Sequence, residues 1–515
     1  MEKEIRNFIL IVAITILVNA YIAYAQYQWP MFRQNSIRTG YTPSPGPTMN
    51  QTLWAYNATY DIWGPSPSVV DGVLYIGLGF GPSVIALNAT TGELIWNYTG
   101  LTWISSSPAV AYGMIYFGSF DKNVYALNAT TGDKIWNYTT GGFMAASSPA
   151  VADGVVYIGG GYGNGVFALN ATTGDKLWNY TTQGNVHSSP AVANGVVYVG
   201  SYDDNVYALN ATTGEKIWNY TTGNDVYSSP TVVDGVVYIG SNDFNVYALN
   251  ATTGEKIWNY TTGFSVVSSP AVVNGVVYVG SWDGNIYALN ATTGALIWSY
   301  TTGGAISSSP AISSNGIVYI GSGDNKTYAL NAQTGDLIWS YETGGDVYSS
   351  PAIADGVVYF ASRYEGKIYA VCGSHQTFNA VWETQNYPVT IISNSSLSDF
   401  TFNQPNKQIS FKVVGPKAMS SFCNVTIPKS LLGGSWTVQI DDSDVVPIIS
   451  ENATHTFIYI AYVHESTHTI KIIGSWVVPE FPTAILITLL MIATVLTVLL
   501  QKGSRLRKMH TKSRH

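Results

Sequence analysis

One segment recurs along most of this chain, and its repetition restricts the possible fold more than any other feature. The copy that begins at Tyr207 reads YALNATTGEKIWNY. Its tryptophan returns every 40 to 42 residues, at Trp54, Trp96, Trp136, Trp178, Trp218, Trp258, Trp298 and Trp339. A period of this length is typical of stacked or radial arrays of small structural units.

Each repeat contains four short segments in which hydrophobic residues alternate with a period of two, which indicates β-strands. In the repeat around Pro230 we call them strands A to D, and they lie after Pro230 and at 236–240, 246–250 and 256–260. Asp234-Gly235 predicts a tight A–B hairpin, and the C–D loop that ends at Gly254 requires a positive φ at that glycine. Four antiparallel strands in a 40-residue repeat predict the blade of a β-propeller.

The number of blades follows from the proline that opens each strand A. It occurs at Pro67, Pro108, Pro149, Pro190, Pro230, Pro270, Pro310 and Pro351. The eighth unit, 351–371, has no Thr-Gly loop after it, whereas 52–57 looks like a strand D without strands A to C. We therefore expect 52–57 to complete an eighth blade, because closing the ring removes two exposed sheet edges. The alternative is a local last strand around Trp382.

The segments outside the repeats predict secretion, a second domain and membrane attachment. Residues 1–25 resemble a cleaved signal peptide, with an uncleaved anchor helix as the alternative. Residues 26–51 lead into a propeller at 52–376, and alternating runs at 377–475 predict a small, Ig-like β-sandwich. A linker at 476–482 precedes an apolar stretch, 483–500, that is long enough to span a bilayer, and a basic tail follows at 501–515. The prediction is a single-pass cell-membrane protein with the propeller and sandwich outside.

Composition excludes some classes of protein. Charged residues make up 10% and aromatic residues 13% of the chain, and the net charge is −8. These values fit packed β-structure and argue against a disordered chain or a nucleic-acid partner. The two cysteines, Cys372 and Cys423, fall in different predicted domains, which leaves open a single disulfide between them.

Ligands of propellers usually bind where the D–A loops and B–C turns meet, and these positions vary here against a constant background. The candidate ligand-binding residues are His187, Tyr202, Asp203, Tyr227, Trp282, Asp283, Tyr348 and Arg363. Aromatic faces beside carboxylates could stack on sugar rings and bond to their hydroxyls. The alternative is that the aromatic residues cap the ends of blades and the aspartates form turns.

Other motifs predict modification rather than catalysis. Glycosylation sequons occur in the C–D loops, at Asn88, Asn128, Asn170, Asn210, Asn250 and Asn290. A second set lies in strand D, where we expect steric crowding, at Asn97, Asn137, Asn179, Asn219 and Asn259. His464 and His468 have a metal-like spacing only on a helix, and their surroundings predict strand and loop, so we predict no metal site.

The pattern A-x-N-x-x-T-G-x-x-x-W, at Ala208 to Trp218, resembles the tryptophan-docking repeat of the quinoprotein (PQQ-type) propellers. That family usually has Asp where this chain has Asn210. Trp29-Pro-Met-Phe, with Thr39-Gly40, is similar to the lead-in of those proteins. The resemblance implies an all-β, eight-bladed propeller, and the family includes dehydrogenases, scaffold proteins of the BamB type and surface proteins.

The C-terminal region resembles archaeal surface proteins. Pro479-Glu480-Phe481, before an apolar run and a basic end, resembles archaeal sorting tails that an archaeosortase removes and replaces with a lipid. The predicted sandwich also resembles modules that precede the anchors of such proteins. Both anchoring routes imply that the propeller lies outside the cell.

The likeness to dehydrogenases would require a pocket for a tricarboxylate quinone, calcium ligands and a catalytic aspartate. The chain lacks the adjacent cysteine pair of those enzymes and has no arginine between Arg38 and Arg363. A tricarboxylate would therefore keep unpaired charge. We predict no catalytic residue and no cofactor, and a membrane-anchored scaffold whose propeller recognises a glycan, a peptide or a surface protein. A PQQ-dependent oxidoreductase is the alternative.

Overall fold

The computed structural model describes residues 28–477, except for 59, 143–145, 162–164, 383–384, 416–419, 452–453 and 465. The predicted signal peptide, membrane span and basic tail lie outside the described residues, as does most of the linker. Within this described part, there is no helix that is long and apolar enough to cross a membrane. The chain divides into two compact units, of which the larger contains the described residues up to His375 together with 392–395 and 420–422.

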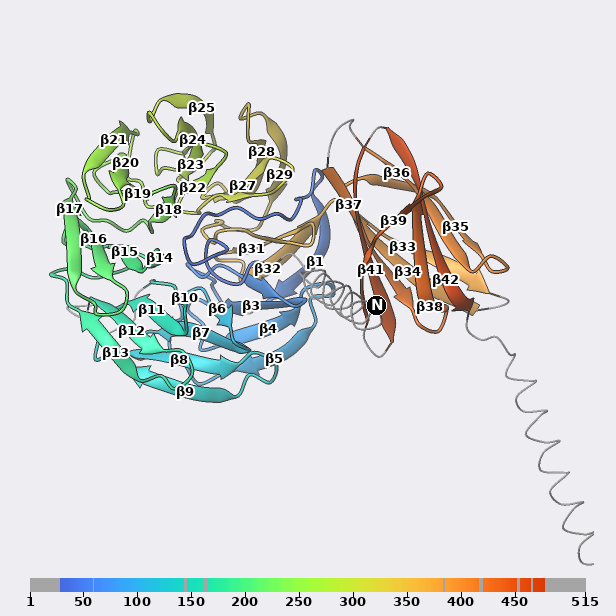
Figure 1. Cartoon of the computed structure of the whole chain (residues 1–515), viewed down its shortest axis with the longest axis horizontal. Helices are drawn as coiled ribbons and strands as arrows, with labels where there is room; N and C mark the ends of the chain where they lie inside the picture. The colour runs from blue at the N-terminus through green and yellow to red at the C-terminus, as the bar shows by residue number, and fades with distance from the viewer. Residues whose placement is uncertain are drawn as a thin grey trace, which may run out of the picture. The chain divides into compact units, whose positions relative to one another are not determined.

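The larger unit is an eight-bladed propeller, and Figure 1 shows its four-stranded sheets in chain order around one axis. Blade 1 contains β2 (Ser68–Val70), β3 (Val73–Gly77), β4 (Val84–Asn88) and β5 (Leu94–Tyr98). Blade 2 contains β6 (Ala109–Ala111), β7 (Met114–Ser119), β8 (Asn123–Asn128) and β9 (Lys134–Thr139). Blade 3 contains β10 (Ala150–Ala152), β11 (Val155–Gly159), β12 (Val166–Asn170) and β13 (Lys176–Tyr180).

The next blades repeat this pattern. Blade 4 contains β14 (Ala191–Ala193), β15 (Val196–Gly200), β16 (Asn205–Asn210) and β17 (Lys216–Thr221). Blade 5 contains β18 (Thr231–Val233), β19 (Val236–Gly240), β20 (Asn245–Asn250) and β21 (Lys256–Thr261). Blade 6 contains β22 (Ala271–Val273), β23 (Val276–Gly280), β24 (Asn285–Asn290) and β25 (Leu296–Thr301). Blade 7 contains β26 (Ala311–Ile312), β27 (Ile317–Ser322), β28 (Lys326–Asn331) and β29 (Leu337–Glu342).

Blade 8 joins the two ends of the repeat array. It contains β30 (Ala352–Ala354), β31 (Val357–Ser362), β32 (Lys367–Cys372) and, as its outer strand, β1 (Gln51–Asn57). β1 is antiparallel to β32, with Trp54 opposite Ala370. The predicted closure is therefore confirmed. The local alternative is wrong, because Trp382 ends a strand of the smaller unit.

Turn chemistry and a recurrent bulge shape each blade. In blade 5, Asp234 and Gly235 have φ values of 49° and 76°, so the predicted tight hairpin has the two positive φ values of a type I′ turn. Strand D carries an irregularity that the sequence pattern did not reveal. Trp258 lies opposite Ala248 and Lys256 opposite Leu249, so Ile257 is left without a partner in the ladder. Equivalent register shifts occur in blades 1 to 7.

The repeated tryptophans connect neighbouring blades. The indole N–H of Trp218 donates to the carbonyl oxygen of Ala251 in the next blade, at 3.0 Å, and the ring lies against Gly254. Trp54 makes the same bond to Ala89 across the closure, at 2.9 Å. Blade 8 has no equivalent C–D loop, so Trp339 donates instead to Pro47 of the lead-in, at 3.0 Å.

A ring of serines surrounds the axis at the start of the inner strands A. In each blade a serine backbone N–H donates to the hydroxyl oxygen of its counterpart in the next blade, over 2.8 to 3.0 Å. The members are Ser66, Ser107, Ser148, Ser189, Ser229, Ser269, Ser309 and Ser350. Because Ser350 bonds back to Ser66, the hydrogen-bonded ring is complete.

The lead-in crosses the inner strands and buries two arginines there. Arg33 and Arg38 are 1% and 0% exposed. Backbone carbonyl groups surround both: Arg33 donates to Ser269 and Pro310, each at 2.9 Å, and Arg38 donates to Pro190 at 2.5 Å. Burial lowers the pKa of both guanidinium groups to about 9, and the nearby charge of Arg38 adds to the effect on Arg33. The lead-in is thus an integral part of the propeller.

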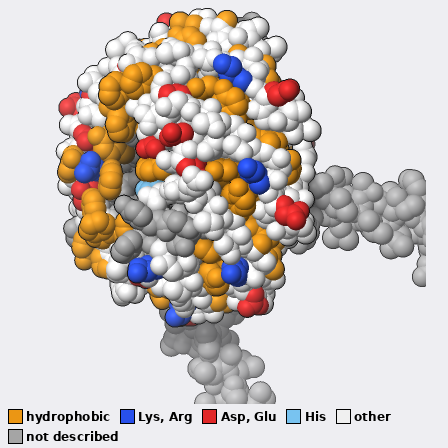
Figure 2. Space-filling model, turned by 90° about the vertical axis from the view of Figure 1, so that its left-hand side faces the viewer, with side chains coloured by type: hydrophobic (Ala, Val, Ile, Leu, Met, Phe, Trp, Pro, Cys, Tyr) orange, Lys and Arg blue, Asp and Glu red, His pale blue; other side chains and the backbone are white. Residues whose placement is uncertain are grey.

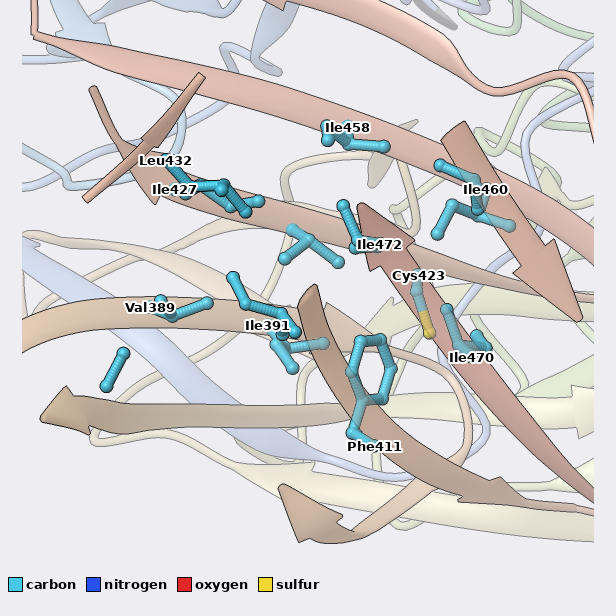
Figure 3. Close-up of a cluster of buried hydrophobic side chains, with 14 of the residues drawn as sticks. Val389, Ile391, Phe411, Cys423, Ile427, Leu432, Ile458, Ile460, Ile470 and Ile472 are labelled. Carbon is cyan, nitrogen blue, oxygen red and sulfur yellow. The ribbon is translucent and has the colours of Figure 1, made fainter. Parts of the chain in front are cut away.

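The smaller unit is a β-sandwich of two five-stranded sheets. One sheet contains β33 (Ser374–Trp382), β34 (Gln385–Ser393), β37 (Ser420–Pro428), β41 (His455–Val463) and β40 (Ile448–Glu451). The other contains β35 (Ser396–Asn403), β36 (Gln408–Val414), β42 (Thr467–Val477), β38 (Leu432–Ile440) and β39 (Ser443–Val445). Side chains of both sheets, including Ile391, Phe411, Ile458 and Ile472, form one buried core (Figure 3).

The structure also shows the surroundings of the two cysteines and of the histidines at 464 and 468. Cys372 and Cys423 are both buried, and no disulfide joins them. His464 follows β41 and His468 lies in β42, not on a helix. Their rings stack at 5.4 Å, and His468 pairs with Asp441.

Candidate functional site

One face of the propeller is built from D–A loops and B–C turns that are hydrogen-bonded to each other. In blade 4 the backbone N–H of Tyr202 in the turn donates to the carbonyl oxygen of Asn185 in the loop, at 2.9 Å. Phe120 and Trp103 make the same bond in blade 2, at 2.9 Å. Because each B–C turn is bonded to the D–A loop beside it, the side chains of turns and loops lie on the same face of the propeller. We call this surface the loop–turn face.

Among the described residues of this face, one group of contacting aromatic rings spans blades 8, 1 and 2. Trp63 stacks on Phe80 at 5.6 Å, Phe80 meets Trp103 edge-on at 4.8 Å, and Trp103 contacts Phe120 at 5.7 Å. Trp63 and Trp103 are 43% and 49% exposed. We call these four residues, with Tyr348, Arg363 and Tyr364, the rim ladder.

Arg363 joins the blade 8 side of the rim ladder to the blade 1 side. Its guanidinium lies 5.2 Å from the ring of Trp63, 5.6 Å from that of Tyr348 and 4.3 Å from that of Tyr364. It also pairs with Asp61 at 3.6 Å. Contacts on several sides hold this cation in place, so the rings around it form a preorganised surface.

Three of the predicted residues form a second cluster, between blades 4 and 5. His187 stacks on Tyr202 at 4.5 Å and contacts Tyr227 at 5.4 Å. Burial lowers the pKa of His187 to about 4 and raises that of Tyr227 to about 12. The cluster is therefore neutral near pH 7, and it is more buried than the rim ladder.

Trp282 belongs to a third aromatic group. It stacks on Phe264 at 6.3 Å, and Phe264 stacks on Phe244 at 5.2 Å. The indole N–H of Trp282 donates to the hydroxyl oxygen of Ser307, at 3.0 Å. All three rings are exposed. The sequence-predicted aromatic residues thus lie in three separate groups.

The two predicted aspartates accept hydrogen bonds from strand C of their own blade and from the D–A loop before it. Asp203 accepts hydrogen bonds from the hydroxyl of Tyr207, at 2.9 Å, and from the backbone N–H of Gln183, at 2.9 Å. Asp283 accepts the equivalent bonds from Tyr287 and Gly263, both at 2.7 Å. These carboxylates hold the B–C turn to strand C and to the D–A loop, which is the turn-forming role considered as the alternative.

Sequence reasoning missed Trp63, Phe80 and Trp103 as candidate site residues. The sequence does distinguish Trp63 and Trp103, because both lie in loops and outside the 40-residue period. Only stacking between blades shows that they adjoin Arg363. A tryptophan outside the docking position, exposed in a loop, is a better indicator of a binding surface than an aspartate in a turn.

The described residues do not fit a pyrroloquinoline quinone with its calcium ion. Within those residues, no group of three or more His, Cys, Asp or Glu side chains is placed to hold a metal ion. Of the cations near the loop–turn face, Arg363 is already paired with Asp61. Figure 2 shows lysines and arginines scattered singly over one side of the molecule, whereas three carboxylates require grouped cations.

The two sets of sequons differ in exposure. In the C–D loops the asparagines are half-buried, and Asn210 accepts bonds from the backbone N–H groups of Thr212 and Thr213, both at 2.9 Å. In strand D the asparagines are exposed. The expectation of crowding in strand D is therefore wrong, because this strand lies at the outer edge of each sheet.

Comparisons with known proteins agree with this architecture. A family model described as outer membrane protein assembly factor BamB matches residues 46–189, 166–309 and 283–401. A sequence comparison with curated proteins found no match.

Solved structures show the same fold at low sequence identity. BamB from Moraxella catarrhalis is 19% identical, with a TM-score of 0.55, over 63% of this chain and 100% of that chain. The quinohemoprotein alcohol dehydrogenase ADHIIG from Pseudomonas putida HK5 is 17% identical, with a TM-score of 0.59, over 70% and 82%. A europium-containing methanol dehydrogenase is 14% identical, with a TM-score of 0.57, over 72% and 90%.

The matched regions extend over more than half of the chain and include all eight blades. The chain therefore belongs to the family of PQQ-type repeat propellers whose model is described as outer membrane protein assembly factor BamB.

Proposed function

We propose that this protein is a non-enzymatic scaffold at the cell surface, and that the rim ladder is the surface with which its propeller binds a protein partner. The observation that carries the proposal is the chain of contacting aromatic rings beside Arg363, in which Trp63 and Trp103 are exposed. Tryptophan, tyrosine and arginine dominate the energetic centres of protein interfaces, and preorganised side chains lose little entropy on binding.

Two further observations favour a scaffold over the alternative oxidoreductase. The carboxylates of the turns, such as Asp203 and Asp283, are bonded to tyrosine hydroxyls and backbone N–H groups. The two arginines that lie near each other, Arg33 and Arg38, are buried and bonded to backbone carbonyl groups, so they are not available to a quinone. An assembly factor stands among the fold relatives, which is consistent with a partner of the protein class.

The proposed location is the outside of a membrane, with attachment through the apolar stretch 483–500 or through a lipid that replaces it. The apolar start and the apolar, basic end of the sequence support this location. Protease applied to intact cells should remove the extracellular units if the purified chain is itself cleavable. Cleavage only after the cells are lysed would contradict the proposed location.

Site-specific photo-cross-linking tests the binding surface. A photoreactive amino acid replaces Trp63 in one variant and Tyr364 in another, in the full chain on intact cells. A third variant carries it at Tyr112, which is 61% exposed and lies in an A–B hairpin away from the loop–turn face. We expect the same protein to cross-link from positions 63 and 364 and not from 112.

The contrary results are also specific. Cross-linking of one partner from position 112 alone would place the interface elsewhere. Cross-linking only to polysaccharide from position 63 would make the rim ladder a glycan site.

A further inference from the structure

The outermost strands of blades 1 to 5 present a row of sequons. Each has Asn-Tyr-Thr directly after the docking tryptophan, and the asparagines are Asn97, Asn137, Asn179, Asn219 and Asn259. All five are exposed, unlike the half-buried asparagines of the C–D loops. Strand D is paired on one side only, so its outer edge is open to a modifying enzyme.

The hydrogen bonds of the two sets differ in a way that favours strand D. In the C–D loop, the backbone N–H of Thr212, the third residue of its sequon, is bonded to Asn210, so the sequon is folded back on itself. In strand D the backbone of Asn219 is extended, and its amide nitrogen donates to Asn205 at 3.0 Å. Because an amide nitrogen carries two hydrogens, one remains for substitution.

An exposed aliphatic side chain accompanies each of these asparagines. The residue before the docking tryptophan is Ile95, Ile135, Leu177, Ile217 or Ile257, and all are 46% to 52% exposed. The strand D bulge leaves this residue without a partner in the ladder. It lies two positions before the asparagine, about 7 Å away along the strand. The tryptophan between them is buried or half-buried, so both neighbours point away from the blade contact.

Blades 6 and 7 provide an internal comparison. They keep the exposed aliphatic residue, with Ile297 at 47% and Ile338 at 37%, but have Ser299 and Ser340 where the others have asparagine. The row of exposed aliphatic side chains thus extends over blades 1 to 7, whereas the strand D sequons occur in blades 1 to 5.

From this arrangement we propose that Asn97, Asn137, Asn179, Asn219 and Asn259 carry N-linked glycans that are attached after the propeller has folded. The glycans cover the aliphatic row and protect the sheet edges of blades 1 to 5. In the transfer, the asparagine Nδ2 forms a bond to the anomeric carbon of a lipid-linked oligosaccharide. The bond from that carbon to the lipid phosphate breaks, the amide loses one proton, and the lipid phosphate leaves. The inference rests on the proposed extracellular location but not on the rim ladder.

Glycopeptide mass spectrometry of the full chain, purified from its own cells, tests the proposal. We expect higher occupancy at the five strand D asparagines than at Asn88, Asn128, Asn170, Asn210, Asn250 and Asn290. Asn219→Gln and Thr221→Ala should each remove the mass of one glycan from the intact protein. Thr221→Ser, which keeps the sequon and its hydroxyl, should not.

Two outcomes overturn the proposal. Equal or higher occupancy in the C–D loops would mean that the unfolded chain is the acceptor. Absence of glycan from both sets, in protein that protease reaches on intact cells, would refute the glycan cover while leaving the extracellular location intact.

Discussion

At the scale of single residues, the same type of side chain has different roles at different places in the repeat. Tryptophans at the periodic position hold neighbouring blades together, whereas Trp63 and Trp103 lie in loops and expose their rings. Asp203 joins a turn to its own strand C through Tyr207. The periodic positions therefore build the frame, and residues outside the period provide the surface for recognition.

His187 leads to a prediction about the pH dependence of stability. Burial lowers its pKa in the folded protein to about 4, whereas the unfolded value is near 6.5. The unfolded state therefore binds a proton first, so stability falls as the pH drops from about 6.5 to about 4. The loss approaches about 3 kcal/mol. Tyr202 and Tyr227, which face His187, stay neutral in this range because burial raises their pKa values.

The check is urea unfolding between pH 7 and pH 4.5 for the parent and for His187→Phe, which keeps a ring beside Tyr202. The variant should lose less stability on acidification than the parent. Equal losses in the two proteins would show that His187 titrates normally in the folded state.

At the scale of strands, the propeller depends on one strand that lies far from its blade in sequence. β1 pairs with β32 and carries Trp54, whose indole bonds to Ala89 in blade 1. The sequence predicted this pairing, because 52–57 resembles a strand D without strands A to C, whereas 351–371 resembles strands A to C without a strand D. The bulge in strand D was not predictable, because a hydrophobic pattern does not show which residue of a strand lacks a partner.

Trp54→Ala tests this closure. We expect the free energy of unfolding to fall by about 3 to 5 kcal/mol, because the change leaves a cavity at the join and removes the bond to Ala89. Ala55→Ser, at the exposed neighbouring position, is the matched control and should change stability by less than about 0.5 kcal/mol. Denaturant unfolding of the purified extracellular part measures both. Parent-like stability of Trp54→Ala would contradict the role given to β1.

At the scale of the whole molecule, sequence reasoning predicted the architecture better than the site. The repeat determined the blade, the blade count and the closure. It did not show which loops meet across blades, because the rim ladder combines residues from three blades that are far apart in the chain, such as Trp63 and Arg363. Nor did it show the serine ring or the burial of Arg33 and Arg38, since both depend on contacts around the axis.

Whether the rim ladder binds a protein partner is tested by the affinity of the purified extracellular part for the partner found by cross-linking. The double variant Trp63→Ala/Trp103→Ala should bind at least about 30-fold more weakly, since one interface hot spot is worth about 2 kcal/mol. Phe264→Ala, an equally exposed ring in another group, should bind like the parent. Parent-like affinity of the double variant, with loss of binding in Phe264→Ala, would show that the partner binds the other aromatic group and not the rim ladder.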